Sequence, residues 1–478
     1  LDMAFFMLES KERMSNIGPL ALLKVPQGAG GAKRFADWLM REMKKRPVGA
    51  PFNLRYQPPS MTSLPMLETV DAVDLNQHCH RITLNGPADD KSLYETVCRL
   101  HEQRLDRRLP LWAFYIIDGL TDSRIALYAK VHHGIIDGRS FVDVATRWFS
   151  TDPSDRTVRA LWEGLPQKLP SGRPRRSTPT LTQIGAGALD SARSVVSLFK
   201  AVARQAQASA KLRPGLPLPF LDAPHVLRTG PKVERILGVC VLPLAQVKAF
   251  GKAHDASVND VLLTTLDMAL SQFLADKGHP ETSSPLVADM PVALKNPGQG
   301  GNKVAVLQFP LGTPGATPLG RLAQIRKHTA NVKQHIKDTS ASALMTYTAV
   351  VHGIPALMEL LKIESGPMLA NMVISNPFGL MEHRWLAGAD LLSTVPLNLL
   401  APGQSLNITA VTYDQGLQIC FMGFAAELPD IQVLADMTMT AFERLQNSNG
   451  PTYVADAASR KFRAIENKAQ PNREKMES

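Results

Sequence analysis

The residues of this chain best suited to chemistry are two adjacent histidines, His132 and His133, which are followed after a short apolar spacer by Asp137 and Gly138. An imidazole has an unperturbed pKa of about 6.5, so it can take up a proton near neutral pH and release it again. General-base catalysis is therefore one interpretation, with Asp137 orienting a group or pairing with a cation. Gly138 would allow a positive φ or the close approach of a substrate to the backbone. The alternative is a pair of histidines that only caps a strand.

The pattern around the motif indicates which histidine reacts. Before it, apolar residues alternate as in a strand, with one face formed by Ile125, Leu127, Ala129, Val131 and His133, and the other by Ala126, Tyr128, Lys130 and His132. After Gly138, Phe141, Val144, Ala145 and Trp148 follow a helical spacing, and Ser140 with Asp143 is typical of a helix start. We predict a strand ending at His133, a turn and a helix. On this pattern His133 is the reactive residue, and His132 positions the loop.

The motif resembles a known family signature. The segment His132-His133-Gly134-Ile135-Ile136-Asp137-Gly138 resembles the HHxxxDG signature of the CoA-dependent acyltransferase superfamily, which includes chloramphenicol acetyltransferase and peptide-synthetase condensation domains. Four further blocks are similar to "RPLW…IEGL", "VNDVVL", "VPVSLR…GGN" and "ISNVPGP" of bacterial wax ester synthase/diacylglycerol acyltransferases. They are Arg108 to Trp112 with Ile117 to Leu120, Val258 to Leu262, Asp289 to Leu294 with Gly300 to Asn302, and Val373 to Asn376. The run Pro377-Phe378-Gly379-Leu380 departs from the family pattern in the loop beside the expected site, which bears on acceptor preference.

The resemblance implies a fold and a reaction. The fold is α/β, with two similar chloramphenicol-acetyltransferase-like domains of mixed sheets and flanking helices that meet at a channel containing His133. The reaction is O-acyl transfer from a long-chain acyl-CoA to a fatty alcohol, a diacylglycerol or both. His133 acts as the base, without an acyl-enzyme and without a cofactor, since acyl-CoA is a substrate. Two alternatives stay open: an enzyme that uses another hydroxyl or amine acceptor, and a non-catalytic lipid or acyl-carrier binding protein.

Three further residues are candidates for stabilising an oxyanion or binding substrate: Asn259, Ser375 and Asn376. Their structural alternatives are a turn or a helix cap for Asn259 and a plain turn for Ser375 and Asn376. Asp137 is expected to support the site through an arginine that the sequence does not identify.

Length and composition indicate a large globular protein. A chain of 478 residues suggests two domains. No apolar run approaches the roughly 20 residues of a membrane-spanning helix, and no secretory signal is recognisable, so a cytoplasmic protein is expected. The chain begins at Leu1, as expected if a short leading segment of the family is missing. The four cysteines, Cys79, Cys98, Cys240 and Cys420, lack metal-site spacing, and no metal is expected.

The net charge of +10 indicates an anionic partner, which could be nucleic acid, an anionic membrane or a phosphorylated cofactor. Because no nucleic-acid-binding motif is present, we expect acyl-CoA and an anionic membrane or lipid-droplet surface as partners, and no nucleic acid. Residues 151–230 form a Pro/Arg-rich linker between domains at 1–150 and 231–478. Within it, a basic amphipathic helix is expected over Leu181 to Leu212. It either lies on the inner face of the membrane or packs across both domains.

The rest of the C-terminal half shows strand and helix periods. Strands are expected over Arg235 to Leu242, Val304 to Phe309, Leu406 to Tyr413 and Leu417 to Phe424. Helices are expected over Leu244 to His254, Asp260 to Leu274, Leu319 to Lys337 and Ile431 to Leu445. The apolar segment Tyr347 to Met372 either lines an acyl tunnel or forms an ordinary core helix.

Overall fold

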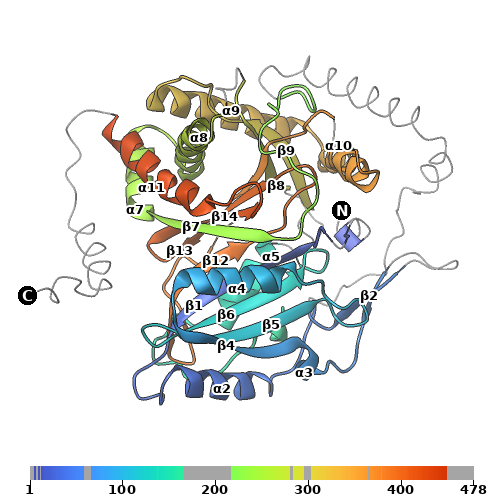
Figure 1. The fold of residues 1–478 in the computed structure, drawn as a ribbon, viewed down its shortest axis with the longest axis vertical. Coiled ribbons are helices and arrows are strands. Elements are labelled where there is room, and N and C mark those ends of the chain that lie inside the picture. The colour runs from blue at the N-terminus through green and yellow to red at the C-terminus, as the bar shows by residue number, and fades with distance from the viewer. Residues whose placement is uncertain are drawn as a thin grey trace, which may run out of the picture.

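The computed structural model describes residues 5–6, 9–10, 12–58, 66–136, 138–165, 217–279, 284–294, 303–363, 366–377 and 379–448. They form two sheet-based halves, one below the other in Figure 1. The basic helix expected over Leu181 to Leu212 lies outside the described residues.

The first half is built on a six-stranded mixed sheet of order β11-β12-β1-β6-β5-β4. Its strands are β1 (Asn16–Lys24), β4 (Cys79–Ala88), β5 (Trp112–Leu120), β6 (Arg124–His132), β11 (Trp385–Leu386) and β12 (Ala389–Leu397). Its helices are α2 (Ala32–Met43), α3 (Leu75–His78), α4 (Asp90–Glu102), α5 (Gly138–Trp148) and the short 3-10 helix η1 (Leu161–Glu163). A separate two-stranded sheet pairs β2 (Leu54–Gln57) with β3 (Met66–Thr69).

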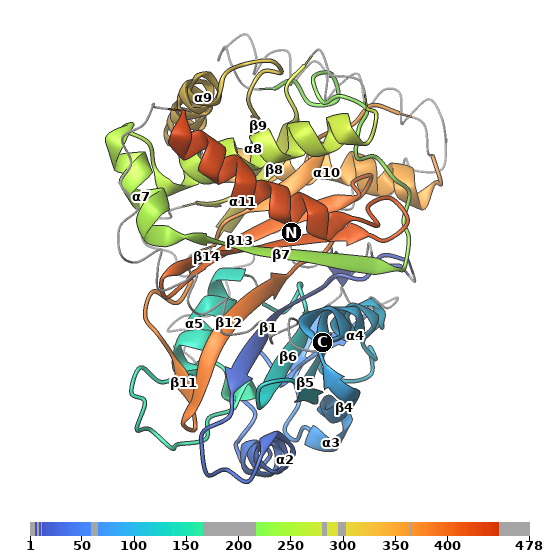
Figure 2. The ribbon, with the colours of Figure 1, turned by 60° about the vertical axis from the view of Figure 1, so that its left-hand side comes forward.

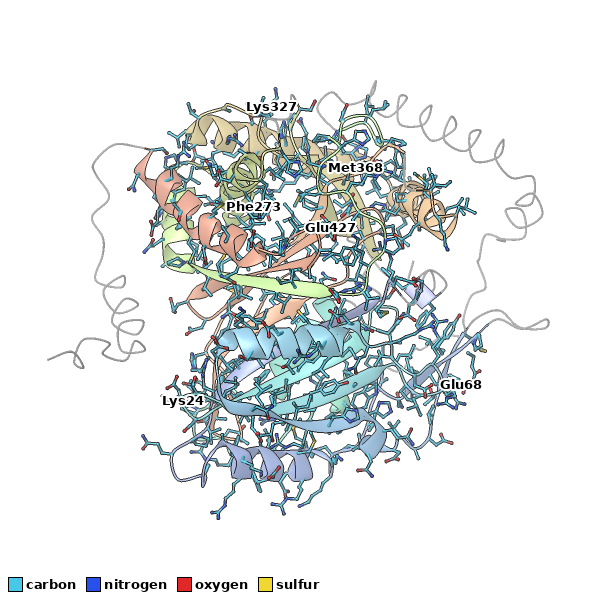
Figure 3. The ribbon with its side chains drawn as sticks, viewed as in Figure 1. Lys24, Glu68, Phe273, Lys327, Met368 and Glu427 are labelled. Atoms are coloured by element: carbon cyan, nitrogen blue, oxygen red, sulfur yellow. The ribbon has the colours of Figure 1, made fainter. Side chains whose placement is uncertain are left out.

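The second half has a six-stranded mixed sheet of order β7-β14-β13-β10-β8-β9. Its strands are β7 (Arg235–Pro243), β8 (Val287–Leu294), β9 (Lys303–Pro310), β10 (Met372–Ser375), β13 (Leu406–Tyr413) and β14 (Gly416–Phe424). Its helices are α7 (Leu244–Ala253), α8 (Val258–Asp276), α9 (Pro318–Asp338), α10 (Ala341–Leu360) and α11 (Ile431–Asn447). In Figure 3, Phe273 of α8 lies in this helical layer, where its side chain is buried.

Apolar alternation explains how β6 is placed between two cores. Ile125, Leu127 and Val131 belong to the cluster that the first sheet shares with α2 and α5. Ala126 and Tyr128 belong to the cluster on the opposite face, which includes α4 and side chains of β7, β12 and β14. The predicted alternation is confirmed, and the second cluster joins the two halves of the molecule.

A late segment of the chain returns from the second half to the first sheet. β12 comes late in the sequence, yet it pairs antiparallel with β1 in the first sheet, and Figure 2 shows the two strands side by side. Residues 385–397 therefore complete the N-terminal sheet, although they lie inside the segment 231–478 that the sequence assigns to the C-terminal domain. Domain boundaries drawn along the sequence alone therefore assign β11 and β12 to the wrong half.

α10 differs from the expectation that no segment is apolar enough to span a membrane. By length and composition, Ala341–Glu359 passes that test among the described residues. However, Val351, Ile354 and Met358 of this helix are buried in the protein, and the helix packs on β9. Only 33% of the apolar stretch is buried, so the helix packs with one face, and both interpretations of the segment, a tunnel wall and an ordinary core helix, stay predictions.

Candidate active site

The motif histidines lie where β6 ends. The strand stops at His132, and His133 begins a turn, so the pleat no longer fixes the direction of the His133 side chain. The backbone N–H of His133 donates to the carbonyl of Ser15 at 2.7 Å. α5 then begins at Gly138, so Ser140 lies inside the first turn and is not the cap that the sequence pattern predicted.

His132 is fully buried and held on several sides. Its Nδ1 accepts a hydrogen bond from the Gly134 N–H at 3.0 Å. Its ring stacks on Phe6 at a centroid distance of 4.4 Å, and its Nε2 is 3.8 Å from Oε1 of Glu9. Burial lowers the pKa of His132 to about 4, although Glu9 opposes the shift. His132 is therefore a neutral imidazole near neutral pH.

His133 is more accessible than its neighbour. Its side chain is partly exposed, whereas that of His132 is fully buried. Its ring lies against Phe5 at a centroid distance of 4.3 Å. Of the two imidazoles, His133 is thus the one with surface available to a substrate.

Buried polar groups fix the end of β6 against α4. Lys130 donates from Nζ to the carbonyls of Leu100 and Gln103 at 2.7 and 2.9 Å. Asn16 donates from Nδ2 to the carbonyls of His101 and Gln103 at 2.9 and 3.3 Å. These donors bind carbonyls in the last turn of α4 and at its C-cap residue Gln103, and the Leu100 carbonyl also accepts from the Gln103 N–H at 3.3 Å. Burial lowers the pKa of Lys130 to about 8.

The remaining motif residues are placed only in part. Asp137 lies outside the described residues, and so does any arginine partnership that it makes. Gly138 is exposed and does not adopt a positive φ, so that part of the expectation is wrong. Apart from its chain neighbours and the backbone of α5, no described atom lies within 4 Å of the position where a Cβ of Gly138 would stand, which leaves space for close approach to the backbone.

The other candidates lie in the second half. Asn259 is the second residue of α8, and the cap is Ser257, whose hydroxyl accepts from the N–H of Asp260, so the cap alternative for Asn259 is wrong. Ser375 ends β10, with its Oγ 3.4 Å from Oγ1 of Thr409, and Asn376 is exposed. Within the described part of the chain, no hydrogen bond joins these three residues to His132.

A cleft of about 270 Å³ lies between α8, α9 and α11 and is lined in part by Met268, Arg321 and Arg444. It contains neither motif histidine. The channel expected to hold His133 therefore stays a prediction.

Sequence reasoning missed the N-terminal contribution to this site. Phe5, Phe6 and Glu9 contact the motif histidines, although more than 120 residues separate them along the chain. No local period could reveal this proximity. The available signal was an aromatic pair, Phe5 and Phe6, and a carboxylate, Glu9, shortly before β1.

Within the described ranges, no group of three or more histidine, cysteine or acidic side chains is arranged to hold a metal ion. The four cysteines are buried free thiols, and burial raises the pKa of both Cys79 and Cys98 to about 12. They are therefore protonated near neutral pH, which makes them poor nucleophiles.

The two sheets with flanking helices have the fold of chloramphenicol acetyltransferase-like proteins and condensation domains. Condensation domains of rhizomide synthetase and of CDA synthetase share this fold with TM-scores of 0.51. Their sequence identities to this chain are only 14% and 15%, over 92% of it, and the alignments cover 93% and 94% of those chains.

The chain belongs to the wax ester synthase/diacylglycerol acyltransferase family. Residues 1–262 match the wax ester synthase/diacylglycerol acyltransferase catalytic domain, and residues 300–446 match the C-terminal domain. It is 31% identical to the probable diacylglycerol O-acyltransferase Tgs4 of Mycobacterium tuberculosis, over 96% of this chain and 98% of that protein. The structure of a Marinobacter aquaeolei wax ester synthase/diacylglycerol acyltransferase is similar with a TM-score of 0.71 at 25% identity, over 94% of this chain and 98% of that one. The protein is therefore an acyltransferase.

Proposed function

We propose that the enzyme transfers a long-chain acyl group from acyl-CoA to the hydroxyl of a fatty alcohol or a diacylglycerol, with His133 as the general base. His133 takes the hydroxyl proton while the oxygen attacks the thioester carbonyl. The new C–O bond forms, the C–S bond breaks, and the imidazolium returns the proton to the CoA thiolate. The two substrates react directly, so no acyl-enzyme forms and no cofactor is needed.

The contrast between the two histidines supports this assignment. His132 is buried, receives an N–H at Nδ1 and has a pKa of about 4, so it is a poor acceptor for a substrate proton. His133 stands next to it with a partly exposed ring. The geometry therefore favours a positioning role for His132 and a reactive role for His133.

The substrate classes follow from the family and from the names of its members. The Marinobacter protein is named for both wax ester synthesis and diacylglycerol acylation, and the mycobacterial relatives for diacylglycerol acylation. Both reactions attack an acyl thioester with an alcohol oxygen, so one base can serve either acceptor.

A thiol-release assay with palmitoyl-CoA tests the proposal, using hexadecanol or a diacylglycerol as acceptor. His133→Ala should lower kcat by about 10² to 10⁴-fold, the usual contribution of a positioned base. His80→Ala, in a partly buried histidine of β4, is the matched control and should retain activity. Full activity of His133→Ala would refute the role of this base, and wild-type inactivity with both acceptors would refute the substrate classes.

The oxyanion of the tetrahedral intermediate requires hydrogen-bond donors, and Asn259, Ser375 and Asn376 are the candidates. Replacing the residue that donates should lower kcat by about 10² to 10³-fold. Single alanine variants assayed with saturating acyl-CoA separate such a donor from a residue that only shapes the fold. A candidate whose variant keeps wild-type kcat is excluded.

The enzyme works at the inner face of the membrane or at lipid droplets, where its acceptors dissolve. The net charge of +10 and the basic sequence around Arg193, Lys200 and Arg204 favour anionic lipid surfaces. Flotation with anionic liposomes tests this location, with those three residues changed to glutamate. Unchanged flotation of the variant would exclude this segment as the contact.

A further inference from the structure

Residues 5–6, 9–10 and 12–15, called here the N-terminal segment, lie beside both motif histidines. Phe5 lies against His133 and Phe6 stacks on His132. Phe6 also stacks on Tyr56 at a centroid distance of 4.4 Å, which fixes the aromatic side of the segment. The segment thus supplies part of the wall around the HHxxxDG motif, although its sequence is remote from the motif.

Glu9 is the charged residue that this segment brings inside. Its side chain is only 2% exposed, and it pairs with Arg107 Nη2 at 2.9 Å and with Arg104 Nε at 3.2 Å. Arg107 also donates to the carbonyl of Phe6 at 2.7 Å. A buried carboxylate is tolerated only where cations or donors compensate it, and the two arginines meet this need.

Hydrogen bonds connect Glu9 to the backbone of the reactive residue. Glu9 Oε1 accepts from the N–H of Ser15 at 3.4 Å. The carbonyl of Ser15 in turn accepts from the N–H of His133 at 2.7 Å. The carboxylate therefore holds Ser15, the residue before β1, whose carbonyl accepts from the His133 backbone.

The same carboxylate faces the ring of His132. Because His132 Nδ1 accepts from the Gly134 N–H, the proton of the neutral ring must be on Nε2. Glu9 Oε1 lies 3.8 Å from that Nε2, so its negative charge favours this tautomer. Reversing the tautomer would place an N–H against the Gly134 N–H and open the turn that carries His133.

We propose that Glu9 is a positioning residue for acyl transfer. It holds His132 in the Nε2–H tautomer and, through Ser15, holds the backbone of His133. The consequence for turnover rests on the proposed role of His133 as the base, whereas the tautomer of His132 does not depend on that role.

The test compares Glu9→Gln and Glu9→Asp with Glu12→Gln. Glu12 lies on the same segment, is exposed and accepts from the hydroxyl of Ser10, which makes it a matched control. Glu9→Gln should lower kcat by about tenfold to 10²-fold, as small misplacements of a catalytic group do, with little change in the KM for palmitoyl-CoA. Glu9→Asp keeps the charge and should recover part of the loss. Glu12→Gln should behave as the wild type.

A spectroscopic measurement separates positioning from mere folding. Nitrogen-15 NMR of histidine-labelled protein reports which ring nitrogen carries the proton, and His132→Asn assigns the signal. The Nε2–H pattern of His132 should be present in the wild type and in Glu12→Gln, and should be mixed or lost in Glu9→Gln. The proposal is overturned if Glu9→Gln keeps this pattern, or if its kcat equals that of Glu12→Gln. If His133→Ala remains active, the proposed base fails while the tautomer result still decides the role of Glu9.

Discussion

Each half of the molecule places a histidine beside a buried carboxylate, and the pKa values of the two histidines shift in opposite directions. In the first half, His132 Nε2 lies 3.8 Å from Glu9. In the second half, His352 Nε2 of α10 lies 3.3 Å from Oδ1 of Asp289 on β8. The pKa of His132 is lowered to about 4, while that of His352 is raised.

The second nitrogen of each ring explains the difference. Nδ1 of His352 donates to the carbonyl of Thr348 at 3.0 Å, so both ring nitrogens face acceptors and an imidazolium fits. Nδ1 of His132 faces the N–H of Gly134, so a second ring proton has no place. Burial disfavours the charged form of both rings, but at His352 the attraction of Asp289 and the hydrogen bonds outweigh it.

The surroundings of the two carboxylates differ as well. Asp289 accepts from Gln308 Nε2 at 2.7 Å and from Gln404 Nε2 at 2.8 Å, and Tyr347 donates to Gln308 at 2.6 Å. This closed network ties α10 to the second sheet. Glu9, by contrast, faces arginines that are 31% and 40% exposed, next to a partly exposed His133. A histidine–carboxylate pair therefore indicates a reactive site only where an accessible group stands beside it.

The largest expected effect comes from breaking the closed pair. Asp289→Ala leaves two buried amide groups and His352 without their acceptor, so the free energy of unfolding should fall by about 3 to 5 kcal/mol. Urea denaturation measures the loss of unfolding free energy. The kcat per folded molecule should stay at the wild-type value. Asp276→Ala, which removes an exposed partner of Gln272, should cost less than about 0.5 kcal/mol. Equal losses in the two variants would show that the Asp289 network does not stabilise the fold.

The next effect is a pH dependence of opposite sign for the two histidines. Because the pKa of His132 is lowered to about 4, the unfolded chain takes up its proton first on acidification, and stability falls between about pH 6.5 and 4. A shift of this size corresponds to about 3 kcal/mol. The raised pKa of His352 stabilises the fold below about pH 6.5, and this contribution is lost as the pH rises through the folded value.

Unfolding curves of the wild type, His132→Asn and His352→Gln test the comparison. They are measured from about pH 4 to a pH above the folded pKa of His352. The wild type should lose stability relative to His132→Asn on acidification, because asparagine does not titrate. It should lose stability relative to His352→Gln as the pH rises. If both differences changed in the same direction with pH, the assigned charge states would be wrong for one of the pairs.

Local periods predicted most of the elements but not their pairing. The strand expected over Leu406 to Tyr413 has these bounds in the structure, and the helix expected over Ile431 to Leu445 continues to Asn447. Such elements follow from side-chain spacing within a few turns of the chain. The insertion of β12 beside β1 depends on packing between remote segments, and no local pattern encodes it.

The same limit applies to the site. The alternation in β6 and the Asp-Gly turn identified the motif, because both are local features. The placement of Glu9 beside His132, and the donor at His132 Nδ1, depend on how the N-terminal segment and the turn fold over the strand end. The ranking of the two histidines therefore stays a prediction from local pattern, and no local pattern reveals what lowers the pKa of His132.

A third histidine sharpens the comparison, because it is half-exposed and links the two halves. His383 contacts Asp390 of β12 in the first sheet and, at 3.0 Å, Asp414 in the turn between β13 and β14. Burial lowers its pKa, but hydrogen bonds to Asp414 and Asp390 outweigh burial, and the pKa is raised. The stabilisation is therefore present below about pH 6.5 and is lost as the pH rises through the folded value.

The expected effect of His383→Gln is the smallest, since solvent screens an ion pair whose histidine is 34% exposed. The variant should lose less than about 1 kcal/mol of unfolding free energy near pH 6, and this loss should shrink in high salt. Once the pH is above the raised folded pKa of His383, this contribution is lost and the variant should match the wild type. A larger loss at high pH than at low pH would mean that His383 acts through packing against Trp385, whose ring lies 4.6 Å away, rather than through its charge.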